Sequence, residues 1–219
     1  MKQQSYRRAF LGLHLVAGFI IFATMTFTLW EISAAINQRE PLTVADAQLS
    51  TWLHSHTLPW LTSATFVITS LGSSVIASCI AVLFGLYLIR RRRLYWLAAF
   101  LSSVYGGMLL NRILKYAFQR PRPHFDDPLL SLTSYSFPSG HTMTATVLYG
   151  VLAAYFFTTT PDWRRRMAIV FVAGFLILLV GFSRIYLGAH YLTDVLGAMA
   201  EGVAWLALCL TVVYSLWRR

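Results

Sequence analysis

The chain has 219 residues and a net charge of +10, with 57% hydrophobic and only 12% charged side chains. A soluble domain normally has about 25% charged residues, so the composition excludes an ordinary soluble fold and indicates an integral membrane protein. The basic residues do not indicate a nucleic-acid partner, because they form short clusters between apolar runs and no basic face interleaved with aromatic residues. We expect a single membrane domain over residues 1–219.

Six apolar runs follow one another along the chain, and runs of about 20 apolar residues mark transmembrane helices. They cover residues 9–30, 61–89, 94–110, 142–157, 167–182 and 195–216. The fourth and fifth runs are short, so their helices should extend into the flanking residues. All seven prolines fall between the runs, as expected of residues that interrupt helices. The pattern predicts an all-α bundle of six transmembrane helices.

The loop after the first run predicts one further, short helix. Residues Thr43 to Asp46 have the form of a capping box, which marks a helix N-terminus. Four apolar residues would then share one face of this helix: Ala45, Leu49, Trp52 and Leu53. We expect the helix to lie in the membrane interface in a structural role.

The distribution of Lys and Arg predicts the orientation. The N-terminal segment, residues 90–93, residues 164–166 and the C-terminus hold 12 of the 18 basic residues, and the alternate segments hold 6. Cytoplasmic segments are enriched in Lys and Arg, so both termini should be cytoplasmic and loops 31–60, 111–141 and 183–194 should face outward. The first run is longer than the apolar core of a cleaved signal peptide, so we expect a retained anchor.

Basic residues remain in the outward loops despite this bias, among them Lys115, Arg120, Arg122 and Arg184. Ionisable groups at membrane depth are costly and usually functional. The planar guanidinium of Arg matches the oxygens of phosphate, and Lys adds a compact charge. Because two histidines accompany these residues, we favour a phosphate site over simple anchoring to lipid headgroups.

Two of the outward segments carry histidine. Ser139 is a candidate N-cap for the helix of the fourth run, and the N–H groups of Gly140 and His141 would then form an anion-binding helix N-terminus. His190 and Asp194 have i,i+4 spacing, which on a helix places both side chains on one face. A carboxylate bonded to one ring nitrogen leaves the other nitrogen as a nucleophile. Taken singly, each segment also fits an ordinary helix cap or a buried polar pair.

Together the segments resemble the three signature motifs of the type 2 phosphatidic acid phosphatase superfamily. The matching stretches read Lys115-x6-Arg122-Pro123, Pro138-Ser139-Gly140-His141 and Ser183-Arg184-x5-His190-x3-Asp194. They occur in order within residues 115–194, and the layout of six runs extends the resemblance over nearly the whole chain. Arg120-Pro121 is a second Arg-Pro pair, but it lies too close to Lys115 to match the motif.

The resemblance implies a role for each motif residue. The implied phosphate ligands are Lys115, Arg122, Ser139, Gly140 and Arg184. His190 would attack phosphorus, oriented by Asp194, while His141 would protonate the leaving oxygen and later activate water. No metal or other cofactor is expected, because fixed cations would neutralise the phosphate. Asp126 and Asp127 are too isolated to indicate a metal site.

The implied activity is removal of phosphate from a lipid phosphomonoester or diphosphate in a bacterial plasma (inner) membrane, with the site facing the periplasm. We rank undecaprenyl diphosphate first as the substrate, because short six-span members often resemble that group. Phosphatidylglycerophosphate, phosphatidate and lipid A phosphates are alternatives, and so is phosphotransfer between lipids. Vanadium haloperoxidases share the motifs but are soluble, and an anion transporter would not need a His–Asp pair beside a second histidine. Glu201, two helical turns beyond Asp194, has no assigned role.

Overall fold

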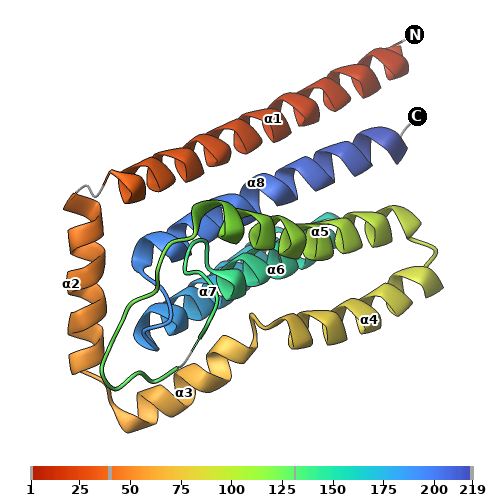
Figure 1. Cartoon of the computed structure of the whole chain (residues 1–219). Helices are drawn as coiled ribbons and strands as arrows, with labels where there is room; N and C mark the ends of the chain where they lie inside the picture. Colours follow the sequence, from red (N-terminus) through yellow and green to blue (C-terminus); the bar gives the residue numbers. More distant parts are fainter. Residues whose placement is uncertain (1, 39–40, 131, 218–219) are drawn as a thin grey trace.

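The computed structural model describes residues 2–38, 41–130 and 132–217, and within these ranges the chain forms eight α-helices and no strand (Figure 1). In chain order they are α1 (Lys2–Asn37), α2 (Pro41–Ser55), α3 (Pro59–Ser70), α4 (Ser74–Arg90), α5 (Leu94–Phe118), α6 (Gly140–Thr159), α7 (Trp163–Tyr186) and α8 (Leu192–Trp217). The predicted all-α class is confirmed.

Within the described ranges, five helices are each long and apolar enough to cross a membrane, and the bent pair α3–α4 is a sixth candidate. The sequence predicted one continuous helix over residues 61–89, but α3 and α4 meet at an angle of 44°. At the bend, Gly72 packs so closely on α6 that a Cβ would lie 2.6 Å from the carbonyl oxygen of His141. Ser73 then caps α4, since its hydroxyl accepts a hydrogen bond from the N–H of Ile76. The helix breaks because of a tertiary contact that the apolar pattern does not encode.

The helices of the fourth and fifth runs extend into the motif residues, as predicted. Helix α6 begins at Gly140 and α7 ends at Tyr186. The prolines behave as expected as well, because Pro41 and Pro59 are the first residues of α2 and α3 and the other five lie in connections.

Helix α6 is the central helix and contacts α4, α5, α7 and α8. The main buried cluster comprises Ala77, Ala81, Leu88, Phe100, Val104, Leu148, Val151 and Tyr155. Large apolar side chains also cover the outer faces of the bundle; Leu83 of α4 and Phe171 of α7, for example, are 71% and 73% exposed. An exposed apolar surface of this extent is unfavourable in water and is suited to lipid.

Small residues let α8 approach its neighbours closely. The indole of Trp205 lies against Gly106 and Gly107 of α5, and its Nε1–H donates to the carbonyl oxygen of Ser102 at 3.1 Å. On the other side, a Cβ at Gly202 would meet Thr146 of α6 at 2.7 Å. Close backbone approach of this kind is how transmembrane helices gain packing energy in lipid.

Helix α2 lies across one end of the bundle, where it contacts α7 and α8 (Figure 1). The predicted capping box is wrong, because the helix includes Pro41 and Thr43 is therefore inside it. Two residues of the predicted apolar face, Ala45 and Trp52, are exposed on the side of α2 away from the bundle. The side that faces the bundle instead buries Asp46 and Ser50. Tertiary partners of Asp46, described below, explain this burial of a charged residue.

Candidate active site

The three motif segments meet at the end of the bundle where α5 and α7 end and α6 and α8 begin (Figure 1). The backbone N–H of Ser139 donates to the carbonyl oxygen of Asp194 at 3.1 Å, which joins the second motif to the third. A guanidinium nitrogen of Arg122 lies 3.2 Å from Nε2 of His190, which joins the first motif to the third. The fold thus brings together segments that are up to 79 positions apart in the sequence.

His190 and Asp194 form a hydrogen-bonded pair, but not on one helix face as predicted. His190 lies in the turn after α7, and Asp194 lies in the first turn of α8. Oδ2 of Asp194 is 3.3 Å from Nδ1 of His190 and also accepts the N–H of Tyr191 at 3.0 Å. The second bond is one half of a capping box, so the same carboxylate starts the helix and orients the imidazole. With the hydrogen assigned to Nδ1 by this bond, Nε2 carries the lone pair, which faces the guanidinium of Arg122 at 3.2 Å.

The imidazole of His190 is only 2% exposed. Burial lowers the pKa of His190 to about 3; the hydrogen bond and charge of Asp194 oppose this effect, while the charges of Arg122 and Lys115 add to it. The ring is therefore neutral at physiological pH, which is the form that has a nucleophilic nitrogen.

Asp194 is fully buried and accepts hydrogen bonds from two further side chains of the described chain. The hydroxyl of Ser136 donates to Oδ2, and Nη1 of Arg120 donates to Oδ1 at 2.6 Å. The sequence predicted neither partner. Ser136 carries no local signal, and Arg120 was expected among the phosphate-binding cations, although its distance from Lys115 does not fit the motif. A buried partner of this kind becomes visible only when the chain is folded.

A tight turn places His190 next to the end of α7. The N–H groups of Ala189 and His190 both donate to the carbonyl oxygen of Arg184, at 3.0 and 3.2 Å. Gly188 adopts a φ of +66° in this turn, and a Cβ there would lie 2.8 Å from the ring of Phe125. Both the backbone angle and the lack of space require glycine at this position.

We expect Gly188→Ala to destabilise the protein by about 1–3 kcal/mol, because it forces a side chain into the left-handed region and against Phe125. Displacement of His190 should lower kcat by roughly 10- to 100-fold. Thermal unfolding and phosphate release in detergent measure the two effects. The matched control is Gly174→Ala in α7, where no atom lies within 4 Å of the added Cβ. Equal behaviour of the two variants would contradict this account of the turn.

Arg122 is held by main-chain oxygens from two loops. Its Nη1 donates to the carbonyl oxygen of Ala189 at 2.6 Å, and its Nε donates to that of Ser134 at 2.6 Å. A third bond runs from Nη2 to the carbonyl oxygen of Tyr135 at 3.1 Å. These bonds fix the guanidinium beside Nε2 of His190.

Lys115 and Arg184 supply two more cations from the ends of α5 and α7. Nζ of Lys115 donates to the carbonyl oxygen of Tyr135 at 2.8 Å, and its side chain passes beside Gly140. Arg184 is 3% exposed, and its Nη1 donates to the hydroxyl of Thr69 on α3 at 2.8 Å. Its buried Nε has no hydrogen-bond partner among the described residues, which leaves a charged donor for a ligand.

The start of α6 adds uncharged donors. Ser139 is the N-cap, as predicted, but its hydroxyl accepts from the Thr142 hydroxyl at 3.0 Å and not from a backbone N–H. The N–H groups of Gly140 and His141 come before the first hydrogen bond of the helix, which Met143 makes. These two N–H groups point out of the helix N-terminus, where they can bind an anion.

The charges of Lys115, Arg122 and Arg184 act on the His141 imidazole, and those of Lys115 and Arg122 also act on the His190 imidazole. By contrast, Asp126 and Asp127 are exposed in the loop and do not take part in this cluster.

Glu201 lies beneath the cluster and is 1% exposed. Its Oε2 accepts a hydrogen bond from the side-chain amide of Asn111 at 2.8 Å. The amide oxygen of Asn111 in turn lies 3.3 Å from the position of a Cβ on Gly140. Asn111 lies one helical turn before Lys115 on α5. Through Asn111, Glu201 therefore contacts the first turn of α6.

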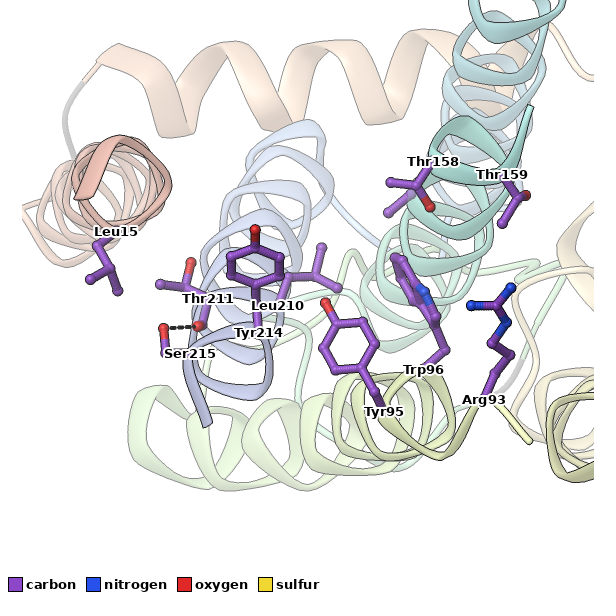
Figure 2. Close-up of a pocket in the computed structure, with 11 residues that line it drawn as sticks. Leu15, Arg93, Tyr95, Trp96, Thr158, Thr159, Leu210, Thr211, Tyr214 and Ser215 are labelled. Atoms are coloured by element: carbon purple, nitrogen blue, oxygen red, sulfur yellow. Dashed lines mark hydrogen bonds between the residues drawn. The ribbon is translucent and has the colours of Figure 1, made fainter. Parts of the chain in front are cut away.

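A cavity of about 670 Å³ lies at the opposite end of the bundle. Figure 2 shows Tyr95 and Trp96, near the start of α5, beside Leu210 and Tyr214, near the end of α8. Arg93 lies at its edge (Figure 2). The cavity is separate from the motif residues, which lie where α5 ends and α8 begins.

Comparison with known proteins agrees with the motif geometry. Residues 96–218, more than half of the chain, match the family described as the PAP2 superfamily. The chain belongs to the PAP2 superfamily. The family predicted from the three motifs is thereby confirmed.

Three curated relatives of this PAP2 protein are phosphatases. Phosphatidylglycerophosphatase B of Bacillus subtilis (strain 168) is 38% identical over 147 residues, which are 66% of this chain and 71% of that protein. Lipid A 1-phosphatase of Rhizobium etli is 32% identical over 173 residues, or 68% of this chain and 69% of that protein. An undecaprenyl-diphosphatase of Sulfolobus acidocaldarius is 28% identical over 127 residues, or 56% of each protein.

A solved structure also resembles this PAP2 chain. The crystal structure of a transmembrane PAP2-type phosphatidylglycerolphosphate phosphatase from Bacillus subtilis has a TM-score of 0.76 and 31% identity, and the match covers 90% of this chain and 96% of that one. The protein is accordingly an integral membrane lipid phosphatase of the PAP2 superfamily. This excludes the anion transporter that the basic residues alone left open.

Proposed function

We propose that this PAP2 protein removes phosphate from a membrane lipid by forming a phosphohistidine at His190. The observation that carries the proposal is the orientation of this neutral, buried ring. Its Nδ1 faces Asp194, and its Nε2 faces the guanidinium of Arg122 at 3.2 Å. A nucleophile next to a phosphate-binding cation is the arrangement that in-line attack on phosphorus requires.

In the first step, the lone pair of Nε2 attacks phosphorus, an N–P bond forms and the bond from phosphorus to the leaving oxygen breaks. His141 donates a proton to that oxygen, and Asp194 stabilises the positive charge that develops on the ring of His190. In the second step, His141 takes a proton from water as the water oxygen attacks phosphorus. The N–P bond breaks, its electron pair returns to Nε2, and inorganic phosphate is released.

Three fixed cations take the role that metal ions have in other phosphatases. Lys115, Arg122 and Arg184 would neutralise the equatorial oxygens of the phosphoryl group, and the Ser139 hydroxyl and Gly140 N–H would add neutral donors. Such fixed positive charges need no reorganisation when the transition state forms.

We therefore expect full phosphate release after the purified protein has been treated with EDTA and dialysed. The physical reason is that all of the compensating charge belongs to the polypeptide. The assay compares treated and untreated protein, each with and without added Mg²⁺. Loss of activity that only a divalent metal restores would contradict the metal-free mechanism.

The arrangement of the helices supports an orientation with the site at the periplasmic face of the inner membrane. Both termini lie at the same end as the connection between α4 and α5, which carries Arg91, Arg92 and Arg93 (Figure 1). The motif residues lie at the other end. Under the positive-inside rule the basic end is cytoplasmic, and α2 would then lie in the outer interface. Arg39, Arg218 and Arg219, which entered the charge count, lie outside the described residues.

For the substrate we propose a phosphomonoester of the phosphatidylglycerophosphate type. Two comparisons support it, the curated phosphatase and the solved structure from Bacillus subtilis. Undecaprenyl diphosphate, ranked first from the sequence, becomes the second candidate, supported by one more distant relative. Lipid A phosphate is supported by the Rhizobium etli relative.

The test is phosphate release by the purified protein from a panel of these three lipids and phosphatidate in detergent micelles. We expect the highest kcat/KM on phosphatidylglycerophosphate. A higher value on undecaprenyl diphosphate would reverse the order of the candidates. Each assay also includes a second lipid alcohol and compares released phosphate with phosphorylated acceptor, because transfer to the acceptor would indicate a phosphotransferase.

A further inference from the structure

Arg120 is buried between two carboxylates. Its Nη1 donates to Oδ1 of Asp194 at 2.6 Å, and its Nη2 donates to Oδ2 of Asp46 at 3.0 Å. The side chain of Arg120 is 9% exposed, and those of Asp46 and Asp194 are 2% and 0% exposed. Both terminal nitrogens are thus occupied by protein carboxylates, and Arg120 is not arranged as a phosphate ligand.

Two residues of the third-motif segment complete this network. Thr193 accepts a hydrogen bond from Nη1 of Arg120 at 2.7 Å and donates its own hydroxyl to Asp46. Its backbone N–H also donates to Oδ1 of Asp46 at 3.1 Å. The ring of Tyr191 lies 4.3 Å from the guanidinium carbon of Arg120, a cation–π distance. Arg120 is therefore held on several sides by the segment that carries His190 and Asp194.

The network connects helix α2 to the reacting histidine. Asp46 belongs to α2 and precedes Lys115, the start of the first motif, by 69 positions. It holds Arg120, Arg120 holds one oxygen of Asp194, and the other oxygen of Asp194 faces His190. A charge-assisted bond to Oδ1 restricts rotation of the carboxylate and keeps Oδ2 on the imidazole.

We propose that Asp46 and Arg120 are positioning residues for catalysis, which fix the Asp194 carboxylate and through it the attacking His190. The proposal rests on the proposed role of His190 as nucleophile. With these roles, α2 contributes to catalysis, and the two neighbouring Arg-Pro pairs, Arg120-Pro121 and Arg122-Pro123, have different functions. Arg120 acts on the orientation of the nucleophile, whereas Arg122 acts on the phosphate.

The test uses Asp46→Asn, Arg120→Lys, Arg120→Gln and the double variant Asp46→Asn/Arg120→Gln. Loss of a residue that orients a reacting group typically lowers activity by about 10- to 100-fold. We expect a decrease of this size in kcat for Arg120→Gln, with KM little changed. Arg120→Lys should recover part of kcat, since it keeps the charge but not the two-pronged geometry. Exposed residues give the controls Arg112→Gln and Asp126→Asn, which should match wild type.

The double variant distinguishes positioning from separate structural roles. If Asp46 acts through Arg120, the double variant should be no slower than Arg120→Gln alone. Multiplied losses, or wild-type kcat in Arg120→Gln and Asp46→Asn, would overturn the proposal. If Arg120→Gln does not fold, Asp46→Asn and Arg120→Lys test the proposal instead. The kcat of both variants should fall, while their monodispersity in detergent and their thermal unfolding stay near wild type.

A second readout identifies the step that is affected. With p-nitrophenyl phosphate as substrate, the leaving group needs no proton, so only the attack by His190 limits the first step. Arg120→Gln should slow the initial release of nitrophenol as much as it slows lipid hydrolysis. A purely structural defect would instead reduce the fraction of active protein and leave its rate constant unchanged. Failure to trap any phosphohistidine in the wild type would refute the proposed function itself, which is a different outcome.

Discussion

Replacement of His190 by alanine should reduce turnover by roughly 10⁴-fold or more while the protein stays folded in detergent. The reason is that the side chain supplies the atom that bonds to phosphorus, and no other described nucleophile occupies its place. The protein should stay folded because the removal of a neutral imidazole leaves no unpaired charge. Asp194 keeps its bonds to Arg120 and Ser136.

The measurement is phosphate release from the best lipid of the panel, with size-exclusion profile and thermal unfolding as tests of folding. His124→Ala is the matched control, because His124 lies exposed in the loop between α5 and α6. It should keep wild-type activity. A His190→Ala protein that hydrolyses lipid at the rate of this control would end the assignment of the nucleophile.

His141→Ala should affect the two chemical steps differently according to the leaving group. With a lipid substrate, the loss of the general acid should lower kcat by about 10²- to 10⁴-fold. With p-nitrophenyl phosphate, the leaving anion is stable without a proton and the first step should persist. The second step still needs a base for water, so the phosphohistidine should accumulate.

The expected observation is a burst of nitrophenol of about one equivalent per protein, followed by slow turnover. Acid-labile, base-stable phosphate on the protein should appear with the same amplitude. The double variant His190→Ala/His141→Ala serves as the control and should give no burst. Rapid steady turnover of p-nitrophenyl phosphate by His141→Ala, with no burst, would show that His141 does not activate the water.

The two histidines differ in the reasons for their positions. His141 is placed by secondary structure, since it is the second residue of α6. His190 lies in an irregular turn, and its place depends on Gly188, on the Arg184 carbonyl oxygen and on Asp194. The position of His190, the proposed nucleophile, is consequently the more sensitive to changes in distant residues, and the proposed effect of Asp46 on α2 depends on this sensitivity.

Much of the fold follows from local pattern. The apolar runs predict the long helices, and the extension of α6 to Gly140 and of α7 to Tyr186 follows from the short fourth and fifth runs. The break between α3 and α4 was not predicted, because residues 61–89 contain neither a proline nor a charged residue. It depends on the contact of Gly72 with the backbone of α6.

The chemistry of the site divides in the same way. The residue types and spacings of the three motifs by themselves predict which groups bind phosphate and which one attacks, since phosphate requires clustered cations and attack requires an oriented imidazole. Only the tertiary structure assigned Asp46 and Arg120, because charge pairing between residues 74 positions apart leaves no local pattern. From the sequence alone, an aspartate such as Asp46 fits a capping box as well as a buried ion pair. The partner that folding brings close decides between the two roles.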